Sequence, residues 1–308
     1  MNKASQAAAS FFHGLEERLH NAFFLAKLKR SSFAPAYLEG QRFGSLFIFN
    51  LSHTIPLPSA TSSRLASGMD VRPGLALAKA LSEYVERVAF LLLWQQSTPL
   101  SGESSSDGFA ALPRLRWVKN HRQQVREISL AESIERLCWP RFWSDPHVAF
   151  TTEALSPAST ALLASCPQLY GAQHIFPRIA SKYHLCISMV RIGSQGVVLG
   201  GGCHLHKNQA IFKSLQEVIR HYFANLNIKN GFYSPTSLYQ RRLHYLGQYG
   251  FSAYKDRLAL QGKAVIKLPR LRHDREVEHP FIDNYVVFRT RFSGQGAFID
   301  DDETLGYV

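Results

Sequence analysis

The sequence lacks any apolar run long enough to cross a membrane. Its longest such run, residues 88–94, falls far short of the roughly 20 residues that a membrane-spanning helix needs. The N-terminal residues also lack the basic start, apolar middle and small-residue cleavage site of a secretory signal. Glu16 and Glu17 argue in the same way against a transit peptide, which is poor in acidic residues. We therefore expect a cytoplasmic protein that does not enter a membrane.

Cysteine is scarce, with 4 residues in 308, and no two of them form a C-x-x-C pair. This excludes a small disulfide scaffold and argues against a zinc knuckle or a redox dithiol. Cys203 lies close to His204 and His206, but no second Cys/His pair has the spacing of a zinc site. We expect free thiols, most of them buried.

Acidic residues are fewer than basic ones, 23 against 35, which leaves a formal net charge of +12. Such a surplus favours partners that carry negative charge, namely nucleotide phosphates, an acidic peptide or nucleic acid. The sequence contains no P-loop, no G-x-S-x-G nucleophile elbow and no recognised nucleic-acid motif. Hydrolase chemistry is therefore disfavoured, and nucleic acid is not expected as a partner.

What the sequence does contain is apolar material for a large core, since 45% of its residues are hydrophobic. Helices are predicted at residues 5–29, 75–94, 123–142 and 209–226, with Pro140 ending the third, and strands at 46–51, 184–192, 197–199, 264–268 and 285–292. Loops are predicted at residues 54–67, 95–113 and 156–167, and an acidic tail at 300–303. Residues 193–196, Gly-Ser-Gln-Gly, indicate a β-hairpin turn, and the three glycines 200–202 are expected to end its second strand.

An internal repeat is the most informative feature. Three of the predicted helices carry the pattern small-Leu-x-Glu-x-aliphatic-Glu/Arg around Glu83, Glu132 and Glu217. The copies lie 49 and 85 residues apart, which does not suit a solenoid of equal units. We therefore expect helices that converge on one site.

The first two copies pair carboxylates three residues apart, Glu83 with Glu86 and Glu132 with Glu135, so each pair shares one helical face. Like charges in that arrangement suit either a solvated surface or a cation, and Mg²⁺ prefers carboxylates together with substrate phosphates. For any single copy, an ordinary solvent-exposed face is the simpler interpretation. Three copies, each with apolar neighbours, favour a shared nucleotide and metal site.

The order of these motifs resembles that of the YcaO family, ATP-dependent enzymes that activate peptide backbone amides. That family is marked by helices carrying A-L-x-E-x-x-E-R, E-x-x-E-R and A-L-x-E-x-x-Q. Residues 67–70 and 78–87 resemble its S-G-x-G loop and first helix, and residues 106–111 resemble its S-N-G-x-A-A-G segment. Residues 128–139 resemble its second helix, and residues 200–220 its third, glycine-preceded helix. The resemblance covers roughly residues 67–221, about half of the chain.

The resemblance implies an α/β (α+β) fold of YcaO type, with mixed sheets and three acidic helices converging on a nucleotide site. It implies an N-terminal helix and strand region at residues 1–66, an ATP-binding core at 67–230, and a strand-containing part of the same globular unit at 231–308. The implied cofactors are ATP and Mg²⁺. The implied metal ligands are Glu83, Glu86, Glu132 and Glu135, and the implied nucleotide-binding set adds Arg87, Asn120, Gln124, Arg136, Glu217 and Arg220.

In the family chemistry, a Cys, Ser or Thr side chain attacks the preceding carbonyl, ATP phosphorylates the oxyanion, and loss of phosphate leaves a thiazoline or oxazoline. The resemblance thus implies a cyclodehydratase that matures ribosomally synthesised peptides such as bacteriocins. It implies a precursor peptide as partner, with a ThiF-like peptide-binding protein and a flavin dehydrogenase as further candidates, and action in a homo- or hetero-oligomer.

Departures from the family pattern motivate an alternative function. Arg220 stands where the third motif usually has glutamine, Leu137 stands where an acidic residue commonly follows, and the stretch between the first two helices is short. The alternative is a degenerate, non-catalytic YcaO-like scaffold that binds a precursor peptide or a partner enzyme.

Overall fold

The computed structural model describes residues 21–27, 35–43, 46–53, 65–96, 107–115, 120–164, 166, 168–229 and 238–294. The strands are β1 (Pro35–Phe43), β2 (Leu46–His53), β3 (Leu65–Asp70), β4 (Gly108–Pro113), β5 (Phe150–Ala154), β6 (Leu169–Pro177), β7 (His184–Ile192), β8 (Gly196–His204), β9 (Leu271–Glu276) and β10 (Tyr285–Phe292). The helices are α2 (Pro73–Gln96), α3 (His121–Ser144), α4 (Pro157–Leu163), α5 (Lys207–Lys229), α6 (Leu238–Ala259) and the 3₁₀ turn η1 (Pro280–Ile282). Residues 21–27 are also helical, within the first predicted helix.

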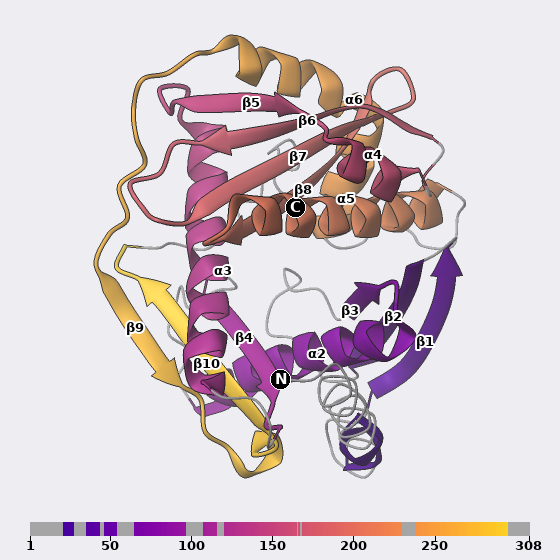
Figure 1. Cartoon of the computed structure of the whole chain (residues 1–308), viewed down its shortest axis with the longest axis vertical. Helices are drawn as coiled ribbons and strands as arrows, with labels where there is room; N and C mark the ends of the chain where they lie inside the picture. The colour runs from indigo at the N-terminus through magenta and orange to yellow at the C-terminus, as the bar shows by residue number, and fades with distance from the viewer. Residues whose placement is uncertain are drawn as a thin grey trace, which may run out of the picture.

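Three antiparallel sheets carry the fold, in the strand orders β1-β2-β3, β4-β10-β9 and β5-β6-β7-β8. In Figure 1 the four-stranded sheet and α5 make up the upper half, and α2 lies with the sheets β1-β2-β3 and β4-β10-β9 in the lower half. Helix α3 stands upright along one side and packs on β4 and β10 at one end and on β7 and β8 at the other. The predicted mixed α/β class is confirmed.

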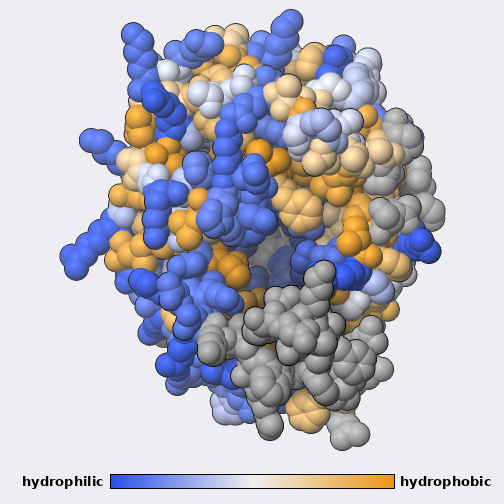
Figure 2. Space-filling model, viewed as in Figure 1, coloured by the Kyte–Doolittle hydropathy of each residue, from blue (hydrophilic) through white to orange (hydrophobic). Residues whose placement is uncertain are grey.

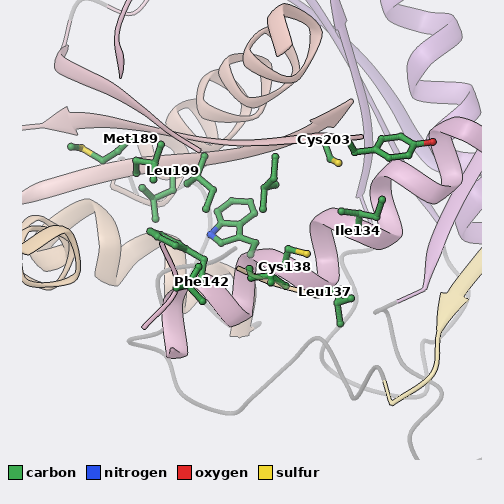
Figure 3. Packing of buried hydrophobic residues seen from close by; sticks show 14 of the residues in the cluster. Ile134, Leu137, Cys138, Phe142, Met189, Leu199 and Cys203 are labelled. Atoms are coloured by element: carbon green, nitrogen blue, oxygen red, sulfur yellow. The ribbon is translucent and has the colours of Figure 1, made fainter. Parts of the chain in front are cut away.

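The four-stranded sheet separates two parts of the core. Along β7, Ile187 and Met189 belong to a cluster with residues of α3 and α6, whereas Val190 packs with residues of α5. This alternation follows from the two-residue repeat of side chains along a strand. Figure 3 shows the first cluster, in which Phe142 of α3 approaches Leu199 of β8. Burial on both faces explains why residues 184–192 read as a nearly continuous apolar run.

The three glycines 200–202 do not end their strand, contrary to the prediction, because β8 continues through them to His204. They let other elements approach the strand closely. A Cβ at Gly200 would lie 2.1 Å from the carbonyl oxygen of Ser214 in α5, and one at Gly201 would lie 2.3 Å from the ring of Trp139 in α3. Glycine is needed here for close packing, not for a turn.

Pro140 lies inside α3, so the prediction that it ends this helix is also wrong. A proline has no N–H to donate to the preceding turn, which weakens the helix at that point. Arg257 of α6 binds the end of the helix after the proline, since its Nε donates to the carbonyl oxygen of Phe142 at 2.6 Å and an Nη to that of Asp145 at 3.2 Å. A tertiary contact therefore holds the last turn of the helix.

Two further predictions need correction. Residues 108–113 belong to the buried strand β4, so the end of the predicted loop at 95–113 is wrong. Residues 264–268 form no strand and contribute isolated bridges only, from Ala264 to Val148 and from Ile266 to Ile179. The predicted loops at 54–67 and 156–167 likewise contain the start of β3 and the helix α4. Residues 5–20, 54–64, 97–106 and 300–303 lie outside the described part of the chain.

The predicted helices at 75–94, 123–142 and 209–226 and the strands at 46–51, 184–192 and 285–292 are confirmed as α2, α3, α5, β2, β7 and β10. All four cysteines are free and buried, as expected. None of the helices in the described ranges is long and apolar enough to cross a membrane.

Candidate functional site

Three helices, α2, α3 and α5, bring acidic residues from three parts of the sequence to one place. Arg220 of α5 forms an ion pair with Glu83 of α2, with 3.2 Å between Nη1 and Oε2. After burial, the charge of Glu132 in α3 is the largest cause that raises the pKa of Glu86 in α2. Figure 2 shows the molecule hollowed near the middle of this face, between the halves to which α5 and α2 belong. The structure thus brings the three sequence repeats together, in a partly buried place where Glu83, Glu132 and Glu217 keep about a quarter of their side-chain exposure. This place is called the recess below.

Small residues explain how each acidic helix reaches this place. A Cβ at Gly68 in β3, Gly108 in β4 or Gly200 in β8 would lie 2.1 Å from a helix carbonyl oxygen, that of Ala76, Ser129 or Ser214 respectively. Each of these helices therefore crosses a strand at a glycine, with its backbone almost touching the sheet. Each repeat begins with a small residue, which lies at this crossing in α3 and α5 and one turn after it in α2. The glutamate of the repeat follows that small residue by three positions.

Backbone N–H groups hold three of the carboxylates. Glu83 accepts a hydrogen bond from the N–H of Ser67 in β3 at 3.1 Å. Glu217 accepts one from the N–H of Gly201 in β8 at 3.2 Å. Glu86 accepts one from the N–H of Ala111 in β4 at 3.0 Å. A carboxylate anchored to a strand in this way is positioned before any ligand binds.

Arginines contact several of the same carboxylates. Arg87 donates to Glu83 at 2.7 Å, one helical turn away in α2, and Arg136 is paired with Glu132 in the same way in α3. Arg136 also donates to the backbone carbonyl oxygen of Asp107 at 2.8 Å. The carboxylates of Glu83 and Glu132 retain 24% and 25% of their side-chain exposure, so the site is recessed but open to solvent. Phosphate oxygens could reach these guanidinium groups from the recess.

The carboxylates differ in how well their charge is compensated. Burial opposes ionisation of Glu83, but the charges of Arg220 and Arg87 outweigh it and hold its pKa below the ordinary value. At Glu86, burial and then the charges of Glu132 and Glu83 raise the pKa well above the ordinary value. This part of the site therefore has more carboxylates than its own cations can keep ionised.

The same excess appears on α3. Burial raises the pKa of Glu132, even though Arg136 and Lys213 act against it. Burial, followed by the charge of Glu217, raises the pKa of Glu135 to about 8. Such carboxylates gain most from an added cation, because it removes the repulsion that disfavours their charged forms.

These residues fit Mg²⁺ bound together with a nucleotide. Among the described residues, no three Asp, Glu, His or Cys side chains are grouped closely enough to hold an ion by themselves. Mg²⁺ is commonly held by one or two carboxylates, with substrate phosphates and water supplying its other ligands. A site of uncompensated carboxylates with arginines beside them provides that kind of partial ligand set.

Two predicted residues lie away from the carboxylates. Asn120 directly precedes α3 with a left-handed backbone (φ 61°), and it lines a separate cavity with Arg114 and Arg122. It precedes Glu132 by 12 residues, which is about 18 Å along a helix. Gln124 is exposed one turn further on. Their contact with nucleotide stays a prediction.

Sequence reasoning missed Lys213 in α5. Its charge lowers the pKa values of both Glu132 and Glu135, and its ammonium lies 3.5 Å from the carbonyl oxygen of Cys203. The signal was available, because Lys213 precedes Glu217 by four residues and so lies one turn away on the same helical face.

Comparison with known proteins supports this fold by structure and not by sequence. No family model matches the sequence, and no curated protein matches it. The structure of YcaO from Methanopyrus kandleri bound with AMPPCP and Mg²⁺ is similar, with a TM-score of 0.59 at 14% identity over 95% of this chain and 94% of that one.

The E. coli microcin synthetase McbBCD complex is also similar, with a TM-score of 0.54 at 11% identity over 83% of this chain and 87% of the other. A heterocyclase in complex with substrate and cofactor gives a TM-score of 0.56 at 11% identity, over 85% of this chain and 50% of that one. The chain therefore has the YcaO-like fold that its motifs predict.

Proposed function

We propose that this chain is a cytoplasmic YcaO-like enzyme that binds Mg-ATP among α2, α3 and α5 and uses it to activate a backbone amide of a peptide. The observation that carries the proposal is the convergence of carboxylates from three separated helices on one recess, in a fold shared with YcaO. Carboxylates that are buried next to one another repel, which destabilises their charged forms. Such a cluster is therefore expected where a cation binds, and not on an ordinary surface. The M. kandleri protein, similar over nearly its whole length, is bound with AMPPCP and Mg²⁺.

Within this function, each group of residues has a role that its position supports. One or two of Glu86, Glu132 and Glu135 would hold Mg²⁺ together with the phosphates, because the site's own cations keep these carboxylates ionised least well. Arg87 and Arg136 would contact phosphate oxygens from the rim of the recess. The nucleotide would supply a phosphoryl group, which makes an amide oxygen a good leaving group. The protein's contribution is positioning and neutralisation of charge.

The proposed substrate is a ribosomally made precursor peptide in which Cys, Ser or Thr closes on the preceding carbonyl to give an azoline. The similarity to a complex with pro-MccB17 bound, and to a heterocyclase with substrate, supports this class. The net charge of +12 suits an acidic peptide. The McbBCD protein is a complex, which supports a partner protein for this chain as well.

Calorimetric titration with ATP, with and without Mg²⁺, tests the proposal. The wild-type chain is compared with Glu86→Gln and Glu132→Gln, and with Glu153→Gln as the control, because Glu153 is paired with Lys207 away from the recess. We expect Mg²⁺-dependent binding that each site variant weakens at least about tenfold, which corresponds to about 1.4 kcal/mol. Equal binding by Glu132→Gln and wild type would refute the site.

One observation favours the scaffold alternative. Arg220 lies between Glu83 and Glu217 and neutralises two carboxylates of the site without any ligand. A chain that no longer used nucleotide would gain stability from such a pair. Absence of nucleotide binding, together with affinity for a precursor peptide, would establish this alternative in the same titration series.

A further inference from the structure

Arg220 bridges two carboxylates that belong to different helices. Its Nη1 lies 3.2 Å from Oε2 of Glu83 in α2, and its Nη2 lies 2.6 Å from Oε1 of Glu217 in α5. Its Nη1 also lies 3.5 Å from the hydroxyl of Ser67 in β3. The three charged side chains keep only about a quarter of their exposure, at 27%, 24% and 26%. The guanidinium is therefore a fixed part of the recess wall.

The two bridged carboxylates occupy equivalent positions. Each accepts a hydrogen bond from the backbone N–H of the residue 16 positions earlier, which is Ser67 for Glu83 and Gly201 for Glu217. Each follows a strand that its helix crosses closely, β3 for α2 and β8 for α5. The guanidinium of Arg220 thus lies between the equivalent carboxylates of Glu83 and Glu217. A divalent metal ion that bridged these two carboxylates would take the same position.

The remaining carboxylates are held differently. Glu83 contacts two arginines, Arg220 at 3.2 Å and Arg87 at 2.7 Å. Glu86 accepts a hydrogen bond from the backbone N–H of Ala111 at 3.0 Å, and Glu132 is paired with Arg136. One side of the recess therefore has Arg220 between two carboxylates. On the other side, three carboxylates, those of Glu86, Glu132 and Glu135, share Arg136 and Lys213.

We propose that Arg220 is a built-in cation that takes the place of a divalent ion between Glu83 and Glu217. The chain then recruits divalent metal only to the side formed by Glu86, Glu132 and Glu135. A guanidinium suits this role, since its planar fork donates to two carboxylates at once and is always charged. The inference rests on the proposed nucleotide site, and it adds a prediction of the number of divalent ions that this site binds.

The test counts ions. Mn²⁺ replaces Mg²⁺, because both favour carboxylate and water ligands, and bound Mn²⁺ per bound AMPPCP is measured by electron paramagnetic resonance. Wild type should take up about one ion per nucleotide, and Arg220→Gln about two, because the neutral amide leaves Glu83 and Glu217 to attract a second ion. The double variant Arg220→Gln/Glu217→Gln should return to about one, since one of the two carboxylates is then neutral.

Arg126→Gln is the matched control. Arg126 pairs with Asp274 outside the recess, so losing its charge should leave the ion count unchanged. A wild-type chain that takes up two ions per nucleotide would overturn the inference even if Arg220→Gln does not fold. So would an Arg220→Gln chain that folds and still takes up one.

The outcomes also separate this inference from the proposed function. If the wild-type chain binds AMPPCP with two ions, the proposed nucleotide site stands and only the proposed role of Arg220 is wrong. If the wild-type chain binds no nucleotide, with or without Mn²⁺, both the proposed function and the proposed role of Arg220 are wrong.

Discussion

Glu83 and Glu217 each accept a hydrogen bond from the backbone N–H of the residue 16 positions earlier, Ser67 and Gly201 respectively. The sequence repeat therefore has a structural counterpart, in which a strand passes close to a helix and a backbone N–H within that strand binds the helix's glutamate. Because the strand must approach the helix backbone to make this contact, the crossing requires small residues on both elements. The repeated small-Leu-x-Glu pattern is what such a crossing needs.

Gly68→Ala should destabilise the protein, because the new Cβ would lie 2.1 Å from the carbonyl oxygen of Ala76 and 2.3 Å from the nitrogen of Ala80. Both atoms are backbone, so α2 would have to shift, and overpacking of this kind costs typically about 1–3 kcal/mol. Gly74→Ala is the matched control, since nothing lies within 4 Å of its added Cβ. In the first turn of α2 it should be neutral or stabilising by up to about 1 kcal/mol.

Urea denaturation of the two variants and the wild type measures this difference. The explanation of the crossing would be wrong if Gly68→Ala and Gly74→Ala had the same free energy of unfolding. A further expectation is that the shift of α2 moves Glu83, so Gly68→Ala should also weaken nucleotide binding while Gly74→Ala leaves it intact.

Local signals in the sequence were enough to locate the helices of the site. Apolar periodicity and helix-forming composition predict α2, α3 and α5, because each of these helices buries an apolar face in the core. The hairpin of β7 and β8 could also be predicted from local sequence, because residues 193–196 have the composition of a turn between two strands. The acidic repeat, being carried by these helices, could be recognised before their arrangement in space was known.

Contacts between distant segments explain what the sequence did not reveal. Strand β4 has the weak strand sequence Gly-Phe-Ala-Ala-Leu-Pro, and it forms because β10, far along the chain, pairs with it. The last turn of α3, after Pro140, accepts hydrogen bonds from Arg257 of α6. The bridge from Arg220 to Glu83 likewise joins residues 137 positions apart. No local pattern encodes these pairings.

The pH dependence of stability should report the uncompensated charge at Glu135. Burial and the charge of Glu217 raise its pKa from 4.5 to about 8. Between these values the unfolded carboxyl is ionised while the folded one keeps its proton, so unfolding releases a proton and the free energy of unfolding falls as pH rises. Glu135→Gln removes this loss. It should match wild type near pH 4 and exceed it at pH 8.5 by on the order of 1–3 kcal/mol.

Urea denaturation at both pH values measures this gap, with Glu153→Gln as the control, because that carboxylate is exposed and paired with Lys207. Glu153→Gln should have no higher free energy of unfolding than wild type at pH 8.5. Added Mg²⁺ should narrow the gap between Glu135→Gln and wild type, since a cation compensates the charge that the variant removes. A gap that is the same at pH 4 and pH 8.5 would contradict the raised pKa.

Lys213 should be coupled to Glu135 through charge. Its ammonium lowers the pKa of Glu135, so Lys213→Gln should raise that pKa further and make the protein less stable at pH 8.5. At pH 5 the carboxyl is protonated with or without the lysine, and only the 3.5 Å contact to the carbonyl oxygen of Cys203 is lost. A double-mutant cycle with Glu135→Gln should give a coupling of roughly 0.5–3 kcal/mol at pH 8.5 and close to none at pH 5.

Lys207→Gln supplies the matched cycle, because Lys207 belongs to the same helix but pairs with Glu153 outside the recess. Its coupling with Glu135→Gln should be close to zero at both pH values. A coupling for Lys213 that does not change with pH would show that the lysine acts on packing and not on charge. A pH-dependent coupling would instead place the ammonium in the electrostatic field of α3, where it limits how much positive charge a bound metal must supply.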